Sequence, residues 1–290
     1  MKKTLTIIIG LRSTISESQK KIIKNSIVIS SDFLKFQKKI MKIKKYNFNL
    51  IFNNFYPSAK IDKVNEKNYL QLNELCLKNL SLILSILNPK KIKKIFYTSS
   101  SSVYIFSKDL NHDLLDYKNR RLQAAYKLAA ENLITNYSLR NKIKYYVMRV
   151  FNTYGNSCDK FSFVEKIIYS KNKCKTIVLN NGGLAYRDFI HIDDVSSIYN
   201  NFIKKNFKSG FYDIGSGRGY KILDIINFVN FKKNLIIKRK LLERKYSIAN
   251  LNKLKKINQG NNIKKLDQYL INNCKLSKNK KLKNIPFRRP

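Results

Sequence analysis

The apolar residues of this chain fall into short β-branched runs, separated by longer stretches in which apolar residues recur at helical spacing. The first such run, TLTIIIG at 4–10, ends in glycine and precedes a polar stretch rich in serine, which favours a helix start. Strand-type runs follow at 26–32 and 48–54, and a long helical face occupies 65–87 until Pro89 stops it. The pattern predicts strands that alternate with helices.

The alternation continues in the middle of the chain. The strand KKIFYTSSSSVY runs into a serine cluster, and a helix containing QAAYKLAAENLI at 123–134 leads to the strand KYYVMRVFN at 144–152. Strands joined in this order need crossover connections, which predicts a parallel sheet with helices on both faces. Ligands of such sheets bind at the carboxyl ends of the strands.

Length and composition narrow the class of protein. The chain has 290 residues, of which 43% are hydrophobic, as in globular proteins. The cysteines are too scattered for a zinc ribbon or a redox pair and only two histidines accompany them, which predicts no metal and a reducing, cytoplasmic compartment. Arg12 ends the N-terminal apolar run without a cleavage site, and no apolar stretch approaches about 20 residues, so we expect neither a secretory signal nor a membrane partner. The cysteines are Cys76, Cys158, Cys174 and Cys274.

The net charge of +41 is the most unusual property of the composition. Basic residues are spread along the chain, for example at 38–45, at 90–96 and in the C-terminal tail, without forming one stripe. The joint excess of Lys, Asn and Ile favours the bias of a low-G+C genome over a nucleic-acid function, so no specific nucleic-acid partner is expected. Weak, salt-sensitive adhesion to polyanions follows from the charge in either case.

Several motifs between residues 4 and 256 occur in a recognisable order, among them the glycine after the first strand, KLAAENLI, RVFNTYG at 149–155 and YRDFIHIDDV at 186–195. Together they resemble the NAD-dependent epimerase/dehydratase family, the extended short-chain dehydrogenases that include UDP-glucose 4-epimerase. The resemblance implies an α/β fold with a Rossmann-like, doubly wound parallel sheet and a smaller C-terminal substrate-binding domain. It implies that 1–155 with about 186–206 form the NAD(P)-binding domain, and that about 156–185 and 207–290 form the substrate-binding domain.

The resemblance places a cofactor site after the first strand. The family has Gly-x-x-Gly-x-x-Gly there, which lets backbone amides and a helix N-terminus approach a pyrophosphate. The same spacing here gives Gly10, Ser13 and Ser16, so only the first glycine is kept. Serine adds a Cβ, but it is small and its hydroxyl can bond a phosphate or cap the helix. NAD is therefore the expected cofactor.

Two further residues occupy family positions near the cofactor. Asp32 follows the second strand, at the distance from Gly10 where an acidic residue would hold the adenosine ribose. It can equally cap the helix FLKFQKK, and both interpretations stand. If Asp32 faces the ribose, NAD is favoured over NADP, because a 2′-phosphate would meet a carboxylate. Asn73 matches an asparagine close to the cofactor, or is an ordinary helix-surface residue.

The resemblance also assigns the catalytic positions. Ser100 matches the Ser or Thr that hydrogen-bonds the reacting sugar hydroxyl, and Lys127 matches the lysine that lowers the pKa of a tyrosine one helical turn away. Gln123 occupies the place of that tyrosine, and glutamine cannot ionise near neutral pH. Tyr126 is adjacent to Lys127, and adjacent side chains point about 100° apart on an ideal helix. Tyr126 therefore replaces the missing group only if the backbone shifts.

The second half of the resemblance concerns the substrate. Asn152, in RVFNTYG, matches a residue that touches the nucleotide-sugar diphosphate, and Arg187, in YRDFIHIDDV, matches the arginine that clamps it. The structural alternative is a surface pair of Arg187 with Asp188 beside a packed His191. Arg244, before the weaker match YSIANLNKLKK, would add a second phosphate contact. The glycines of YDIGSGRGY, Gly215 and Gly217, are expected to form a turn.

Two functions remain open from the sequence. The first is an enzyme that epimerises, reduces or dehydrates a nucleotide-activated sugar in surface-polysaccharide synthesis, with Ser100 and Lys127 assisting. The second is a noncatalytic relative that serves as a binding or partner subunit, because the tyrosine and two glycines are lost. The family commonly dimerises through two helices per subunit, which implies a homodimer through 70–87 and 120–136.

Overall fold

The structure is a computed structural model, and its contacts divide the chain into two compact units. Unit 1 comprises Met1–Tyr104, Lys118–Arg149 and Ser196–Tyr212, and unit 2 comprises Ile105–Tyr117, Val150–Val195 and Asp213–Pro290. By these contacts, 186–195 lies in unit 2 and 196–206 in unit 1. Arg12 and Cys158 lie outside the described residues, which are 3–11, 13–43, 45–53, 66–106, 118–155, 162–232, 234, 236–239, 244–255, 263–277 and 281–287.

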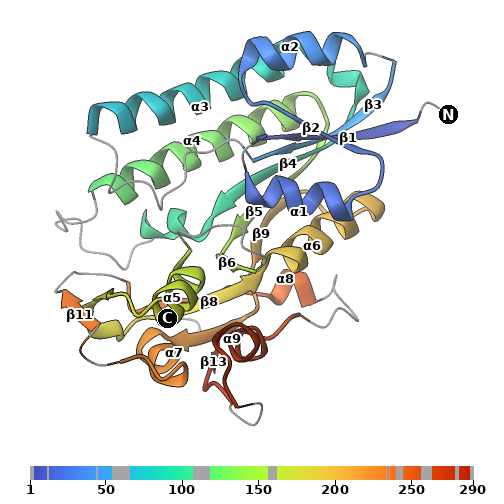
Figure 1. The fold of residues 1–290 in the computed structure, drawn as a ribbon. Helices are drawn as coiled ribbons and strands as arrows, with labels where there is room; N and C mark the ends of the chain where they lie inside the picture. Colours follow the sequence, from blue (N-terminus) through green and yellow to red (C-terminus); the bar gives the residue numbers. More distant parts are fainter. Residues whose placement is uncertain are drawn as a thin grey trace. The chain divides into compact units, whose positions relative to one another are not determined.

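Unit 1 is built on a six-stranded parallel sheet in the order β2-β1-β3-β4-β5-β9, which confirms the predicted α/β fold (Figure 1). The strand order reverses between β1 and β3, and ligands of such sheets bind at this switch point. The Rossmann order has one more strand outside β2, whereas here α2 leads directly from β2 to β3. The strands are β1 (Thr4–Ile9), β2 (Ser26–Ile29), β3 (Asn47–Phe52), β4 (Ile92–Ser100), β5 (Lys144–Val150) and β9 (Gly210–Ile214).

Helices cover both faces of this sheet, because the central strands are apolar on both sides. In Figure 1, α2, α3 and α4 lie on one face, and α1 and α6 lie on the other. The first face packs Phe36, Leu80 and Ile134 onto the strands, and the second gathers aromatic rings that include Phe96 and Tyr199, with centroids 5.7 Å apart. The helices are α1 (Thr14–Ile22), α2 (Phe33–Met41), α3 (Glu66–Ile86), α4 (Lys118–Arg140) and α6 (Ile192–Lys204), with the 3₁₀ turns η2 (Pro89–Lys91) and η3 (Ser101–Phe106).

The second strand is shorter than its apolar pattern predicts. It ends at Ile29 rather than at Asp32, because local side-chain bonds turn the backbone toward the next helix. The Ser30 hydroxyl accepts a hydrogen bond from the Asp32 amide, and Asp32 in turn accepts one from the Lys35 amide at 3.0 Å. Asp32 is thus the N-cap of α2.

Unit 2 holds a smaller sheet in which β8 is central. The path β12-β8-β10-β13 is joined by β6, which pairs with β8, and a separate ladder joins β11 to β7. Its core includes Tyr154, Ile167, Phe189, Ile225 and Leu270. The elements are β6 (Asn152–Tyr154), α5 (Phe163–Asn172), β7 (Ile177–Asn180), η5 (Asn181–Gly183), β8 (Tyr186–His191), β10 (Arg218–Lys221), α7 (Ile222–Phe228), β11 (Ile236–Arg239), β12 (Tyr246–Ser247), α8 (Asn252–Lys255), α9 (Leu266–Cys274) and β13 (Ile285–Pro286).

Candidate functional site

The turn between β1 and α1 lies at the carboxyl end of the sheet and requires glycine at its first position. Gly10 has φ +135°, and a Cβ on it would come within 3.0 Å of the Asn53 carbonyl oxygen. The Ser13 amide donates to the Gly10 carbonyl at 3.0 Å, which closes the turn. Ser13 is the N-cap of α1, yet its side chain makes no capping bond. The first turn of α1 begins directly after this loop, and its backbone amides have no acceptor within the helix.

Ser16, the second serine in a family glycine position, is fully buried and hydrogen-bonded. Its Oγ accepts a bond of 2.8 Å from Asn53 Nδ2, which also donates to Gln19 Oε1 at 2.8 Å. Asn53 Oδ1 accepts from Thr98 Oγ1 at 2.5 Å, and the Thr98 and Tyr199 hydroxyls lie 2.6 Å apart. The Cβ of Ser16 is thus part of a packed polar network that joins α1, β3, β4 and α6. Sequence reasoning missed this network, although a polar residue closing an apolar strand was its visible signal.

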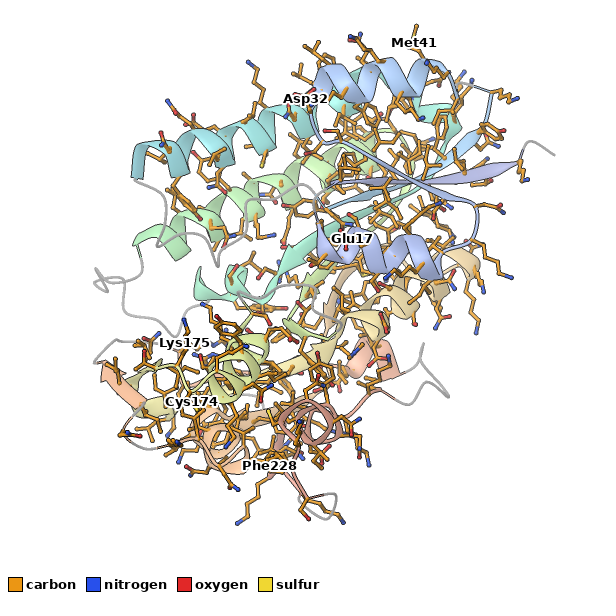
Figure 2. The ribbon with its side chains drawn as sticks, viewed as in Figure 1. Glu17, Asp32, Met41, Cys174, Lys175 and Phe228 are labelled. Carbon is orange, nitrogen blue, oxygen red and sulfur yellow. The ribbon has the colours of Figure 1, made fainter. Side chains whose placement is uncertain are left out.

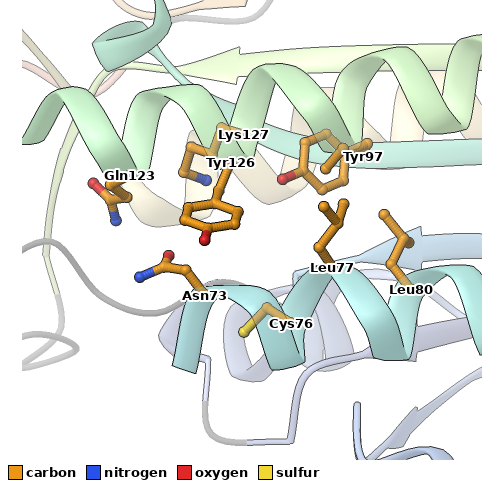
Figure 3. Close-up of a pocket in the computed structure, with 9 residues that line it drawn as sticks. Asn73, Cys76, Leu77, Leu80, Tyr97, Gln123, Tyr126 and Lys127 are labelled. Atoms are coloured by element: carbon orange, nitrogen blue, oxygen red, sulfur yellow. The ribbon is translucent and has the colours of Figure 1, made fainter. Parts of the chain in front are cut away.

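A small pocket between α3 and α4 brings together three predicted site residues, Asn73, Gln123 and Lys127 (Figure 3). Gln123 and Lys127 lie one helical turn apart on α4, and both are only 4% exposed. Asn73 faces them from α3 and is also buried, with its Nδ2 donating to the Tyr69 carbonyl at 2.8 Å. The alternative that Asn73 is a helix-surface residue is wrong, because α4 covers this face of α3.

The Lys127 amine is held in an apolar setting. Its Nζ lies 3.4 Å from the Thr98 carbonyl oxygen and 5.9 Å from the centre of the Tyr97 ring. Burial lowers the pKa of Lys127 to about 7, and the opposing influence of Glu131 is smaller. Near neutral pH the amine is therefore shared between its charged and neutral forms, unlike an exposed lysine.

Tyr126 lines the same pocket, although ideal helix geometry predicts that it points away from its neighbour Lys127. Its ring points toward α3 (Figure 3). The hydroxyl donates to Glu74 Oε1 at 3.3 Å. Burial, followed by the Glu74 carboxylate, raises the pKa of Tyr126. A raised pKa opposes the easy proton exchange that the resemblance assigns to the family tyrosine.

The serine cluster at the end of β4 divides into an inward and a terminal position. Ser99 is buried and donates to Glu131 Oε1 at 2.5 Å, and Arg149 pairs with the same carboxylate at 3.1 Å through Nε and 2.7 Å through Nη2. Ser100 is the last residue of β4, where its Oγ accepts from the Ser102 amide at 3.1 Å. The pair of the buried Glu131 with the partly exposed Arg149 was missed from the sequence, although a glutamate four residues after Lys127 was its signal.

In unit 2, the Asp188 carboxylate binds backbone amides in the interior and is not one half of a surface pair. It is fully buried, and its carboxylate accepts from the amides of Ser216 (2.8 Å), Gly217 (2.8 Å) and Ala249 (3.1 Å). Burial raises the pKa of Asp188 to about 6, against the opposing effect of these donors. The predicted Arg187–Asp188 surface pair is wrong, because successive side chains of a strand point to opposite faces. The loop at Ser216 is the expected glycine turn.

Arg187 and Asn152 lie on paired strands of unit 2. The register of β6 on β8 sets Asn152 opposite Phe189, and Asn152 Nδ2 donates to the Asp188 carbonyl at 2.8 Å. The half-buried Arg187 donates through Nη1 to the carbonyls of Tyr186 at 2.9 Å and Arg244 at 2.8 Å. The structure therefore brings Arg187 next to Arg244, the residue proposed for a second phosphate contact.

His191 is packed, as its structural interpretation predicts. Its ring meets Tyr154 edge-on at 5.2 Å, and a Cβ on Gly155 would lie 2.3 Å from its Nε2. Burial, followed by Lys264, lowers the pKa of His191. Within the described residues, no group of three or more His, Cys, Asp or Glu could hold a metal ion.

The chain is similar in sequence to known proteins. Residues 1–215 match the sequence model of the NAD dependent epimerase/dehydratase family. The chain is 31% identical over 153 residues to an ADP-L-glycero-D-manno-heptose-6-epimerase of Brachyspira hyodysenteriae, a match that covers 49% of this chain and 47% of that protein. It therefore spans about half the length of the curated relatives that it matches.

Solved structures match over a longer part of the chain. A dTDP-glucose 4,6-dehydratase from Bacillus anthracis, in complex with NAD, has a TM-score of 0.71 at 14% identity, covering 94% of this chain and 96% of that one. A UDP-glucose 4-epimerase from Thermotoga maritima, with UDP-glucose, has a TM-score of 0.71 at 15% identity, covering 93% and 97%. At these identities the likeness shows the fold.

Proposed function

Because the chain belongs to the NAD dependent epimerase/dehydratase family, we propose that it binds NAD and acts on a nucleotide-activated sugar by epimerisation, reduction or dehydration in surface-polysaccharide synthesis. The observation that carries the proposal is the pocket that holds Gln123 and Lys127 one helical turn apart beside Asn73. The names of the relatives include ADP-, dTDP- and UDP-linked sugars, which supports the class of substrate but no single sugar.

The residues of unit 1 fit a dinucleotide. Gly10 leaves the loop free of a Cβ where a Cβ would strike Asn53, and Ser13 presents a hydroxyl that is not used for capping at the N-terminus of α1. A helix N-terminus attracts a pyrophosphate through its free amides and its dipole. Ser16 does not oppose this, because its hydroxyl is directed into the interior toward Asn53. The exposed Asp32 carboxylate lies after β2, where a ribose hydroxyl would meet it, which favours NAD over NADP.

NAD, when bound, supplies the hydride acceptor and donor. The residues of this chain would bind and orient the sugar: Ser100 at the end of β4 holds a reacting hydroxyl, and Gln123 can hold another but cannot exchange its proton. Lys127, with its lowered pKa, is a titratable group one helical turn from Gln123 on α4. In unit 2, Asn152 and Arg187 would bind the diphosphate, the latter through charge-assisted hydrogen bonds.

A noncatalytic role is the second candidate function. It is favoured by the non-ionisable Gln123, together with the Tyr126 hydroxyl, which lies at Glu74 and has a raised pKa. Such a protein would keep the sugar-nucleotide site and serve as a binding or partner subunit.

Calorimetric titration of the cofactor-stripped chain tests the shared basis of both candidates. NAD, NADP, UDP-sugars and dTDP-sugars are titrated in parallel at physiological salt, and we expect saturable binding of NAD and of one class of sugar nucleotide. Absence of dinucleotide binding would contradict the enzyme, and absence of sugar-nucleotide binding as well would contradict both candidates.

Turnover then separates the two candidates. If the wild type turns over a bound sugar nucleotide, the enzyme is supported. If only Gln123→Tyr does so, while the matched variant Gln123→Phe stays inactive, the missing phenol is the whole defect and the wild type is noncatalytic. The Phe variant controls for ring volume, since Gln123 is buried.

The proposal also includes an oligomeric state and a cellular compartment. We expect a homodimer through α3 and α4, where Leu75 is among the exposed large apolar side chains. Light scattering that reports only monomer at high concentration would contradict this. Among the described residues Cys76, Cys174 and Cys274 form no disulfide bond, and we expect a reducing, cytoplasmic compartment. Within the described ranges, no helix is both long and apolar enough to cross a membrane.

A further inference from the structure

The edge of the unit 1 sheet where the strands begin is bordered by five basic loops. In a parallel sheet every helix-to-strand connection returns to this edge, opposite the edge where ligands bind. The loops that lead into β2, β3, β4, β5 and β9 each carry between three and five Lys or Arg residues and no Asp or Glu. They occupy 20–25, 38–46, 88–94, 139–145 and 203–209.

Contacts across the sheet join these loops into one surface. Lys94, at the start of β4, donates from Nζ to the Lys205 carbonyl at 2.8 Å, and the Tyr145 amide donates to Ser209 Oγ at 3.3 Å. The parallel registers set Ser26, the first residue of β2, beside Thr6, and Asn47, the first residue of β3, beside Thr4 of the same strand β1. We call the exposed side chains of the five loops the amino-edge surface.

The density of basic residues shows that composition alone does not produce this surface. A genome-wide excess of lysine raises the basic count everywhere, but the five loops hold 18 of the 59 Lys and Arg residues in 36 of the 290 positions. The described acidic residues of unit 1 belong to other parts of it, in the first turn of α1, at the N-cap of α2, in the first half of α3 and within α4. Figure 2 shows Asp32 and Met41 at opposite ends of α2. The five residues are Glu17, Asp32, Glu66, Glu74 and Glu131.

Exposed aliphatic side chains lie within the basic surface. Met41 and Leu139 are 56% and 61% exposed and occupy the last turns of α2 and α4, two helices on one face of the sheet. Single-stranded nucleic acids are bound by exposed aromatic rings on which bases stack. The large apolar side chains exposed along the described part of this edge are aliphatic, and Tyr46 and Tyr145 are half-buried.

We propose that the amino-edge surface docks unit 1 on an anionic phospholipid bilayer. Loops that carry lysines and no carboxylates of their own complement lipid phosphates, and aliphatic side chains among them enter the interface, the combination by which surface helices bind membranes. The opposite edge, with Gly10 and Ser13, then faces the water phase and its ligands. This inference does not rest on the proposed function. It replaces the expectation, drawn from the sequence, that the protein has no membrane partner. The contact would be with the membrane surface and would need no spanning segment.

Sedimentation with lipid vesicles tests the proposal on the full chain. We expect binding to vesicles that contain phosphatidylglycerol and little binding to pure phosphatidylcholine. Each lysine at an anionic surface contributes about fivefold to partitioning, so the triple variant K42Q/K93Q/K205Q should bind on the order of a hundredfold more weakly. All three side chains are exposed.

The matched control K35Q/K166Q/K232Q removes the same charge from exposed lysines outside the amino-edge surface and should bind as the wild type does. Equal weakening by both variants would overturn the proposal in favour of unlocalised attraction. Binding to an oligonucleotide that the edge variant loses, without vesicle binding, would identify a nucleic-acid partner instead.

The variant M41Q/L139Q separates the contribution of apolar insertion from that of charge, because it should abolish only the vesicle binding that persists at high salt. If no binding persists there in the wild type, insertion is refuted.

Discussion

Replacing Ser16 by glycine restores the residue that the family has at this position, and the structure predicts that the restoration destabilises the protein. The buried Ser16 hydroxyl accepts a bond of 2.8 Å from Asn53 Nδ2. Losing this bond costs about 0.5–1.5 kcal/mol, since Asn53 keeps Gln19 as an acceptor. Glycine within α1 adds about 0.5 kcal/mol relative to serine. The free energy of unfolding should therefore fall by about 1–2 kcal/mol.

Urea unfolding of the wild type, Ser16→Gly and Ser13→Gly measures this difference. Ser13 is the matched control, because it occupies the other altered glycine position but its side chain makes no capping bond. Replacing an N-cap serine by glycine costs only a few tenths of a kcal/mol. NAD affinity, titrated in parallel, should not rise in Ser16→Gly, since the hydroxyl does not face the loop. Unchanged or increased stability of Ser16→Gly would refute the reasoning.

Three further predictions concern other buried groups. Glu131→Ala should lower the free energy of unfolding by about 1.5–3 kcal/mol in urea, because the Ser99 hydroxyl and the partly exposed Arg149 guanidinium lose the buried carboxylate that both bond; a loss below about 0.5 kcal/mol would contradict this. Burial lowers the pKa of Lys127 from 10.5 to about 7, so between these pH values the unfolded chain holds a proton that the folded chain has released, and stability should rise with pH. Unfolding measured across this pH range should show no such rise for Lys127→Met. Equal slopes of the free energy of unfolding against pH in the wild type and the variant would contradict the prediction. Gly155→Ala should cost more than about 2 kcal/mol by thermal unfolding, because φ is +112° and the new Cβ would lie 2.3 Å from His191, whereas Gly182→Ala, with nothing within 4 Å, should cost less.

The parallel sheet of unit 1 could be predicted from the sequence because its signal is local. Runs such as Ile7–Ile9 in TLTIIIG are apolar at consecutive positions, as strands covered on both faces must be, and helical spacing between the runs requires crossovers. The absence of an ionisable group at position 123 was equally readable, since Gln123 follows from residue type alone. The Asp32 cap, one of two interpretations, follows from bonds within four residues.

Tertiary structure decided the residues whose environment depends on distant segments. Ser16 and Asn53 are separated by 37 positions, so no local pattern shows that one hydroxyl accepts from the other amide. Asn73 is buried only because α4 packs over α3, and Tyr126 lines the Lys127 pocket because that packing directs it.

The same distinction holds for the charge. The sequence gives a count of lysines spread along the chain, and only the return of every crossover to one edge gathers five loops into a single surface. Local sequence fixes the burial pattern and backbone bonds within a few residues, because both depend on near neighbours. Pairing across the fold depends on chain topology, and so buried networks, pockets and charged faces were settled by the tertiary structure.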